Sequence, residues 1–171
     1  AISPNGKGKM TLIIDRTSWS RGAIEYNILF VAVLFKDRCL PVMFMPLAKG
    51  SGGSSTLERI ELFETLMQSI PVHRMQVIMG DKEFGNLAFI KYLNEKQIPY
   101  CIRLKDGHYF RMQTSEETPI SITRYAADLK PNQTMRLKHI WLGIEEKISI
   151  CITIKRLESG QLLTLVHSPE L

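Results

Sequence analysis

The sequence predicts an α/β protein with a mixed sheet, flanking helices and a second part that is mostly β. Three observations support this prediction. Three strand-like segments follow one another between residues 10 and 47. Helix-like and strand-like segments then alternate up to residue 104, which implies helices packed on a mixed sheet. Short strand-like segments separated by turns occupy residues 108–167.

The first three strands are predicted over residues 10–15, 27–35 and 38–47. The first is rich in β-branched residues, and the second is apolar on both faces and should be central in the sheet. The third contains Pro41 and Pro46, which cannot donate ladder hydrogen bonds. We therefore expect this strand to lie at an edge or to carry a bulge.

The polar residues 16–25 should form a loop or a hairpin connection between the first two strands. A flexible Gly/Ser loop over residues 49–56 precedes a helix, in which Ser55 and Glu58 have capping-box spacing and which Pro71 ends. Apolar residues of this helix recur at steps of three and four: Leu57, Ile60, Phe63, Leu66, Met67 and Ile70.

The chain then continues with a strand over residues 75–79, a helix over 86–96 and a strand over 99–104. After the turn at Asp106-Gly107 the pattern is mostly β. Strands are predicted over residues 108–112, 120–125, 135–142, 147–155 and 162–166.

Composition limits the classes of function. The 171 residues suffice for one full-sized core, or for a core with a small inserted subdomain. The net charge of +5 suits a polyanionic partner such as nucleic acid. The three cysteines lack zinc-ligand spacing and lie in apolar segments, so we expect buried free thiols in a reducing compartment. We expect no signal peptide, and the longest apolar run, residues 28–35, is too short to span a bilayer.

Two carboxylates follow apolar strands. Asp15 ends the first predicted strand and Asp81 ends the fourth. Two such side chains on neighbouring strands can share Mg²⁺, which prefers oxygen ligands and can activate one oxygen and stabilise another in phosphodiester cleavage. The alternative is that each aspartate is a surface turn residue or a helix N-cap, and the strand-end pattern alone leaves both interpretations open.

Several motifs together resemble the DDE transposases of the insertion-sequence-four family. Residues 12–19 (LIIDRTSW) with Asn27 resemble the family's first-aspartate motif, and residues 80–85 (GDKEFG) resemble its second, with Lys82 in place of the usual Arg. The strand over residues 100–105 (YCIRLK) resembles the one after the second aspartate. The motif elements between the two aspartates also occur in the family's order: Pro41-Val42, Leu47, Gly50 and Ser51.

This resemblance implies a ribonuclease H-like core over residues 1–107 and a β-rich insertion, with the start of the return to the core, over 108–171. It implies that Asp15 and Asp81 are catalytic ligands of Mg²⁺ or Mn²⁺. The family's third ligand is a Glu on a later helix, within a Tyr, Arg, Glu, Lys pattern that is absent here; Glu170 lacks that context and is not assigned. We expect the chain to stop just before that helix and to have little activity alone.

The resemblance also implies partners and a location. The full-length enzyme would bind transposon ends and target DNA, cleave a strand and transfer it. Active transposases generally act as dimers on paired ends, which implies a homodimer. The bacterial cytoplasm, at the nucleoid, is the expected location. A degenerate, non-catalytic remnant that binds DNA or protein is the alternative, and a different ribonuclease H-like nuclease would need another acidic ligand.

Four further residues carry weaker hypotheses about DNA contact or site tuning. Arg16 could contact a phosphate or form a surface ion pair. Lys82 lies in the second motif and is a candidate DNA contact. Glu83 could tune the site, although a solvated acid in the first turn of a helix is the favoured interpretation. Trp141 could stack on a flipped base near the transposon end, but packing between strands is favoured. The loop over residues 50–53 is a further candidate for DNA contact.

Overall fold

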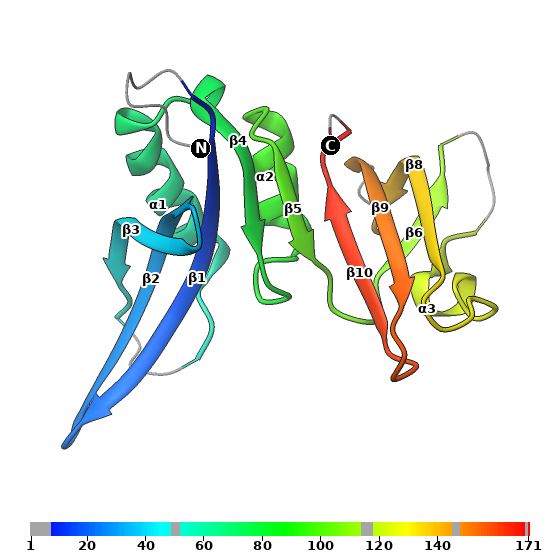
Figure 1. Cartoon of the computed structure of the whole chain (residues 1–171), viewed down its shortest axis with the longest axis horizontal. Helices are drawn as coiled ribbons and strands as arrows, with labels where there is room; N and C mark the ends of the chain where they lie inside the picture. Colours follow the sequence, from blue (N-terminus) through cyan, green and yellow to red (C-terminus); the bar gives the residue numbers. More distant parts are fainter. Residues whose placement is uncertain (1–7, 49–51, 114–117, 145–147, 170) are drawn as a thin grey trace.

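The computed structural model of the chain describes residues 8–48, 52–113, 118–144, 148–169 and 171 (Figure 1). Its strands are β1 (Met10–Arg21), β2 (Ile24–Phe35), β3 (Arg38–Pro46), β4 (Met75–Gly80), β5 (Tyr100–Arg103), β6 (Tyr109–Met112), β7 (Ile120–Ser121), β8 (Thr134–Leu142), β9 (Ile148–Arg156) and β10 (Leu162–His167). Its helices are α1 (Thr56–Ser69), α2 (Leu87–Glu95), the short α3 (Ile122–Tyr125) and the 3-10 helix η1 (Val72–Arg74).

Across the described ranges the strands join in one sheet, in the order β3-β2-β1-β4-β5-β10-β9-β8-β6-β7. β1, β2 and β3 form an antiparallel meander, and β4 and β5 run parallel to β1. α1 leads from β3 towards β4, α2 joins β4 to β5, and both helices lie behind the same side of the sheet in Figure 1. The ribonuclease H-like mixed sheet with flanking helices is therefore confirmed.

The core lies between this side of the sheet and the two helices. Leu12, Ile14 and Ile78 are fully buried or nearly so, and they alternate with residues on the opposite face. On that opposite face Met79 is 43% exposed and Ile13 is half-buried. The described helices therefore cover one face of this part of the sheet, and the ends of β1 and β4 remain accessible from the other.

α1 begins at the predicted capping box. The hydroxyl of Ser55 accepts a hydrogen bond from the Glu58 amide at 3.2 Å, and the Glu58 carboxylate accepts one from the Ser55 amide. Leu57, which we expected on the apolar face, is 78% exposed. The buried stripe includes Arg59, and Leu57 lies two residues before it, about 200° around the helix.

Both expectations for the third strand are confirmed. β3 forms one edge of the sheet. Its register against β2 shifts between Val31, which pairs with Met43, and Ala32, which pairs with Pro41. The extra residue in this bulge is Val42, so the edge position and the bulge together accommodate the prolines.

Of the two expectations for residues 16–25, the hairpin is the one that forms: the strand pairing of β1 with β2 continues to Arg21 and Ile24, and a tight turn at Gly22, with φ of +62°, closes it. One predicted segment differs from the structure. Residues 120–125 are not mainly a strand. Only β7 is extended there, and α3 follows because the Ser121 hydroxyl caps it by accepting from the Arg124 amide at 3.2 Å.

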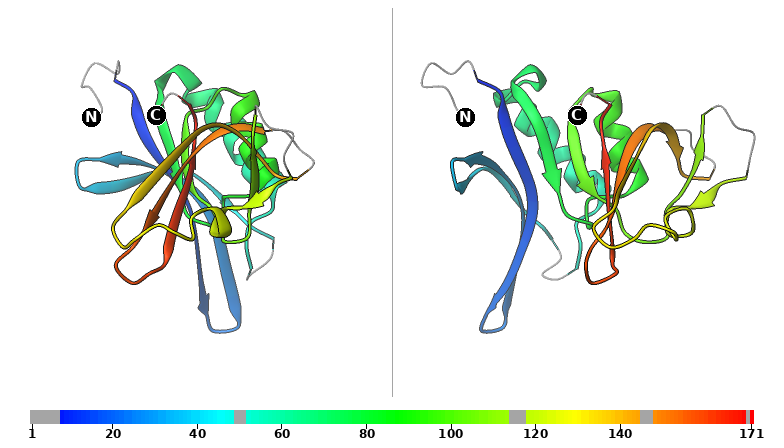
Figure 2. Two further views of the ribbon diagram at one scale, coloured as in Figure 1. Left: turned by 90° about the vertical axis from the view of Figure 1, so that its right-hand side faces the viewer. Right: turned by 45° about the vertical axis from the view of Figure 1, so that its right-hand side comes forward.

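The second half of the chain continues the same sheet. β10 pairs antiparallel with β5 on one side and with β9 on the other, which attaches β8, β6 and β7 beyond. Figure 2 shows this half curling away from the plane of the first. The division into a core over residues 1–107 and an insertion over 108–171 stays a prediction. No helix in the described ranges combines the length and apolar character needed to cross a bilayer.

Candidate functional site

Asp15 and Asp81 occupy neighbouring positions just beyond the point where the parallel pairing of β1 with β4 ends, Asp15 within β1 and Asp81 directly after β4. Ile14 of β1 pairs with Gly80 of β4. Asp15 directly follows Ile14, and Asp81 directly follows Gly80. Neighbouring strands lie about 4.8 Å apart, so the two backbones approach each other to about that distance here. Both aspartates are exposed. The pairing of distant strands thus brings together the two carboxylates that the sequence singles out.

Gly80 allows this close packing. A side chain at this position would place its Cβ 3.0 Å from the Ile14 side chain and 3.2 Å from the ring of Phe84. Its missing side chain therefore lets β1, β4 and the turn after β4 pack together next to the aspartates.

Local backbone bonds orient each carboxylate. Asp15 Oδ1 accepts from the Arg16 amide at 2.8 Å, and Asp81 Oδ1 accepts from the Glu83 amide at 2.8 Å. Neither aspartate has an ion-pair partner among the residues that the structure describes. One oxygen of each carboxylate therefore lies outside these bonds and is open to a ligand.

An ion pair joins β1, which carries Asp15, to the turn after β4, which carries Asp81. Arg16 Nε lies 3.1 and 3.0 Å from the two carboxylate oxygens of Glu83. Arg16 also donates to the side-chain oxygen of Asn27 at 3.1 Å. Because Arg16 follows Asp15 in β1 and Glu83 lies two residues after Asp81, this pair ties the turn after β4 to β1 next to both aspartates. Glu83 is half-buried and precedes α2, so it is not the solvated first-turn acid that we favoured.

Ser54 and Arg59 also contact the Glu83 carboxylate. Its Oε1 accepts from the Ser54 amide at 2.9 Å and from the Ser54 hydroxyl at 3.0 Å. The buried Arg59 donates from Nε to the same hydroxyl at 2.8 Å, and its Nη2 lies 3.8 Å from Glu83. Arg59 also stacks on Phe84, 5.1 Å from the ring centroid. Glu83 therefore joins the turn after β4 to β1 and to the start of α1.

Charge and burial act in opposite directions on this cluster. Burial by itself would raise the pKa of Glu83, but hydrogen bonds from Ser54 and Arg16 outweigh it and leave that pKa below its ordinary value. Burial lowers the pKa of Arg59, and the negative charge of Glu83 opposes this effect. Glu83 is accordingly a carboxylate held in its charged form as the shared counter-ion of two guanidinium groups.

The candidate metal ligands at this site are the two aspartates. No group of three or more His, Cys, Asp or Glu side chains in the described ranges could hold a metal ion. Two carboxylates still suit Mg²⁺, which proteins commonly bind through one or two carboxylates while waters and substrate phosphates complete the shell. The chemistry of the donors therefore fits a hard divalent cation.

The other predicted site residues lie at different distances from the aspartates. Lys82 is exposed in the turn directly after Asp81. Trp141 lies on β8, five strands from β1 in the sheet, which is a path of roughly 24 Å measured across the sheet. It is half-buried beneath Arg111, whose guanidinium lies 5.7 Å from its ring centroid. The loop over residues 50–53 falls partly outside the described residues, as does Glu170.

Sequence reasoning missed Ser54 and Arg59. A signal for Arg59 was present, because it stands at the helical spacing of the buried Leu62, Phe63 and Leu66. A cation on the buried stripe of a helix implies a buried partner. No sequence pattern indicates that Glu83 is that partner, since the pair depends on how the turn after β4 packs against the start of α1.

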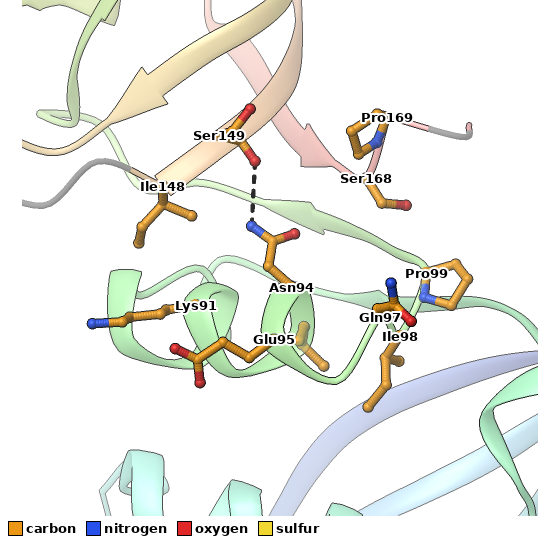
Figure 3. A pocket seen from close by; sticks show the side chains of 11 residues that line it. Lys91, Asn94, Glu95, Gln97, Ile98, Pro99, Ile148, Ser149, Ser168 and Pro169 are labelled. Carbon is orange, nitrogen blue, oxygen red and sulfur yellow. Dashed lines mark hydrogen bonds between the residues drawn. The ribbon is translucent and has the colours of Figure 1, made fainter.

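A cavity of about 670 Å³ lies elsewhere (Figure 3). Its walls come from α2 and the turn after it, from the start of β9, and from Ser168 and Pro169 after β10. Asn94 and Ser149 face each other across it, with an Asn94 Nδ2 to Ser149 carbonyl distance of 3.3 Å. Neither aspartate is among its lining residues. The candidate site is therefore an exposed surface where the pairing of β1 with β4 ends, and it is not an enclosed pocket.

Comparison with known proteins supports the fold. The structure resembles the piggyBac transposase in a synaptic complex with hairpin DNA, with a TM-score of 0.59 at 11% identity, covering 96% of this chain and 34% of that one. The catalytic domain of human endonuclease V (TM-score 0.47, 13% identity, 95% and 69% covered) and endonuclease V of Bacillus subtilis (0.41, 9%, 94% and 65%) align less closely.

At these identities the likeness concerns the fold alone, and the chain spans about a third of the length of the piggyBac protein. No protein-family model and no curated protein matches the sequence. The comparisons thus support a fold like that of the piggyBac transposase and do not identify the insertion-sequence-four family.

Proposed function

We propose that this chain is the catalytic core of a DNA transposase of the DDE class, which resembles the insertion-sequence-four family and carries two of its metal-binding carboxylates. The observation that carries the proposal is the register of β1 with β4, which sets Asp15 beside Asp81. A transposase-like fold and the two ordered aspartate motifs support it independently.

In this proposal Asp15 and Asp81 together hold Mg²⁺ or Mn²⁺ through their unengaged oxygens. The ion would activate an attacking oxygen and stabilise the leaving oxygen at a DNA phosphate. The described residues contribute no third carboxylate, so waters, phosphate oxygens and a residue outside the matched motifs would complete the shell.

The surrounding residues position the aspartates and bind DNA. The Arg16–Glu83 pair holds β1 and the turn after β4 at a fixed separation. Two ligands can share one ion only if their separation is held in this way. Because the Arg16 guanidinium is already engaged by Glu83 and Asn27, the exposed Lys82 is better placed to contact a phosphate. Trp141 stays a proposed contact for a more distant part of the DNA.

The wider context of the proposal rests on the family resemblance. Transposon ends and target DNA would be the substrates, and the full-length enzyme would act as a homodimer on paired ends. The bacterial cytoplasm, at the nucleoid, would be its location.

Metal binding tests the proposal. Mn²⁺ is titrated calorimetrically into the wild-type chain, into Asp15→Asn and into Asp81→Asn, with Asp106→Asn as a control because Asp106 is an exposed aspartate in the turn after β5. We expect weak binding that both site variants lose and the control retains. Equal Mn²⁺ binding by all four proteins would show that the aspartates hold no metal.

A non-catalytic DNA-binding module is the second candidate, and it is favoured because no third His, Cys, Asp or Glu in the described residues is placed to hold a metal ion together with the pair. The two candidates differ in how metal affects DNA binding. A catalytic core should bind DNA more tightly with Mn²⁺, because the ion bridges the aspartates and a phosphate. A non-catalytic module should bind DNA equally well with and without Mn²⁺, and equally well in the two asparagine variants.

A further inference from the structure

The β1–β2 hairpin extends beyond every other strand of the described sheet. β1 has no pairing to β4 after Ile14, and β2 has no pairing to β3 before Ile28. The two strands nevertheless stay paired with each other as far as Arg21 and Ile24. Residues 19–26, which we call the arm, thus form a two-stranded ribbon that projects from the sheet (Figures 1 and 2).

The two faces of the arm differ sharply in chemistry. Directly paired residues point to the same side, so one face carries the pairs Trp19 with Tyr26 and Arg21 with Ile24. Trp19 is 48% exposed, Ile24 59% and Tyr26 37%. The opposite face of the arm is polar and carries Ser20 and Glu25. Exposed apolar surface concentrated on one face indicates a binding partner on that face.

This face continues the surface that carries Asp15. Side chains alternate along a strand, so Asp15, Thr17 and Trp19 lie on the same side of β1. Trp19 lies four residues after Asp15, which corresponds to about 13 Å along β1. Successive nucleotides of one strand in a duplex rise by about 3.4 Å, so the separation corresponds to roughly four nucleotides.

The aromatic pair has the geometry of a stacking platform. The rings of Trp19 and Tyr26 lie 5.3 Å apart between centroids and are inclined by 15°. Such a parallel pair leaves the outer ring face free to continue the stack with a nucleobase. Arg21 is the only charged residue on this face of the arm, and its charge complements a phosphate next to the stacked base.

We propose that the arm binds an unpaired nucleotide of the DNA substrate, which stacks on the Trp19–Tyr26 pair roughly four nucleotides from the phosphate held at Asp15. This proposal rests on the proposed function, because it names the part of the DNA that extends away from that site. The competing explanation is purely structural, namely that the aromatic pair only holds the ribbon together, since an isolated hairpin is marginally stable in water.

Tryptophan fluorescence distinguishes the two explanations. The chain contains two tryptophans, so Trp141→Phe leaves Trp19 as the sole emitter. This variant is titrated at low salt with unlabelled single-stranded DNA of about 20 nucleotides, longer than the site sizes usual for such surfaces. Binding is measured in parallel by the anisotropy of a labelled oligonucleotide of the same sequence. Stacking on Trp19 should quench its emission over the same DNA concentrations that raise the anisotropy.

Variants of the arm provide the second measurement. Trp19→Thr should weaken DNA binding by a factor of about 5 to about 150, the range expected for losing one base–aromatic stack, whereas Trp19→Phe should retain most of the affinity. Tyr109→Thr is the matched control, because Tyr109 is an aromatic of β6 with 42% exposure. It should bind like wild type. Circular dichroism melts of each variant exclude unfolding as the cause.

Each outcome decides a different point. DNA binding with unchanged Trp19 emission and a wild-type affinity for Trp19→Thr would overturn the arm proposal and leave the proposed function intact. Absence of any DNA binding by the wild-type chain would overturn the proposed function itself. If sedimentation shows a wild-type dimer that Trp19→Thr dissociates without changing DNA affinity, the arm binds a second copy and the nucleotide assignment is wrong.

Discussion

Removing the Glu83 carboxylate tests how the candidate site is held together. Glu83→Ala deletes the hydrogen-bond acceptor of Arg16 and Ser54 and the ion-pair partner of Arg59 without touching either aspartate. Arg59 would then be left as a buried guanidinium, with a side chain only 4% exposed, without its ion-pair partner. The variant should therefore be destabilised and should also loosen the link between β1 and the turn after β4.

The size of the effect follows from the burial of the pair. Breaking a fully buried ion pair costs about 3–5 kcal/mol, whereas exposed pairs contribute about 0.2–1 kcal/mol. The side chains of Arg16 and Glu83 are 20% and 22% exposed, which sets this cluster between the two cases. We expect Glu83→Ala to lower the free energy of unfolding by about 2–3 kcal/mol and the Tm by roughly 5–10 °C for a domain of this size.

Thermal unfolding followed by circular dichroism measures this loss. Glu61→Ala is the control, because Glu61 is an exposed residue of α1 and should change the Tm by no more than about 2 °C. A double-mutant cycle of Glu83→Ala with Arg16→Ala should give a coupling energy above about 0.5 kcal/mol. A Glu83→Ala melt indistinguishable from that of Glu61→Ala, with no coupling to Arg16, would refute the role given to Glu83.

Three further changes have defined outcomes. Ser55→Ala removes the α1 capping box and should cost about 1 kcal/mol in urea unfolding; an unchanged midpoint would contradict the cap. Gly85→Ala places a Cβ 2.4 Å from the Arg103 carbonyl oxygen, so it should destabilise more than Ser55→Ala does, and a neutral result would contradict that packing. Burial of the His108 imidazole, together with the positive charge of Lys105, lowers the pKa of His108 in the folded protein below its ordinary value of 6.5. The contribution of the neutral imidazole to stability is therefore complete above pH 6.5 and is lost as the pH falls through the lowered pKa of the folded state. His108→Gln should therefore flatten the pH dependence of stability below pH 6.5, and an unchanged slope would refute this assignment.

The sequence predicted most of the first half because its signals are local. The apolar segments ending at Asp15 and Asp81, the capping box at Ser55 and the prolines of β3 each depend on nearby residues, and the structure has all of them. The register between β1 and β4 is not local. It could be expected only from the order of elements, and it is the feature that makes two distant aspartates neighbours.

The differences arise where contacts between distant segments outweigh local composition. The polar residues 16–21 have a composition typical of a loop, yet cross-strand pairing extends β1 through them. Glu83 has the position of a solvated acid in sequence, yet Arg16 and Ser54 approach it from 67 and 29 residues away. Such partners cannot be deduced from spacing, because they depend on how the turn after β4 packs against β1 and α1.

The most direct test of the central claim is a crystal structure of the chain soaked in Mn²⁺, with anomalous scattering used to locate the ion. We expect one anomalous peak within bonding distance of carboxylate oxygens from both Asp15 and Asp81. Density on other residues alone, or two aspartate side chains too far apart to share one ion, would contradict it.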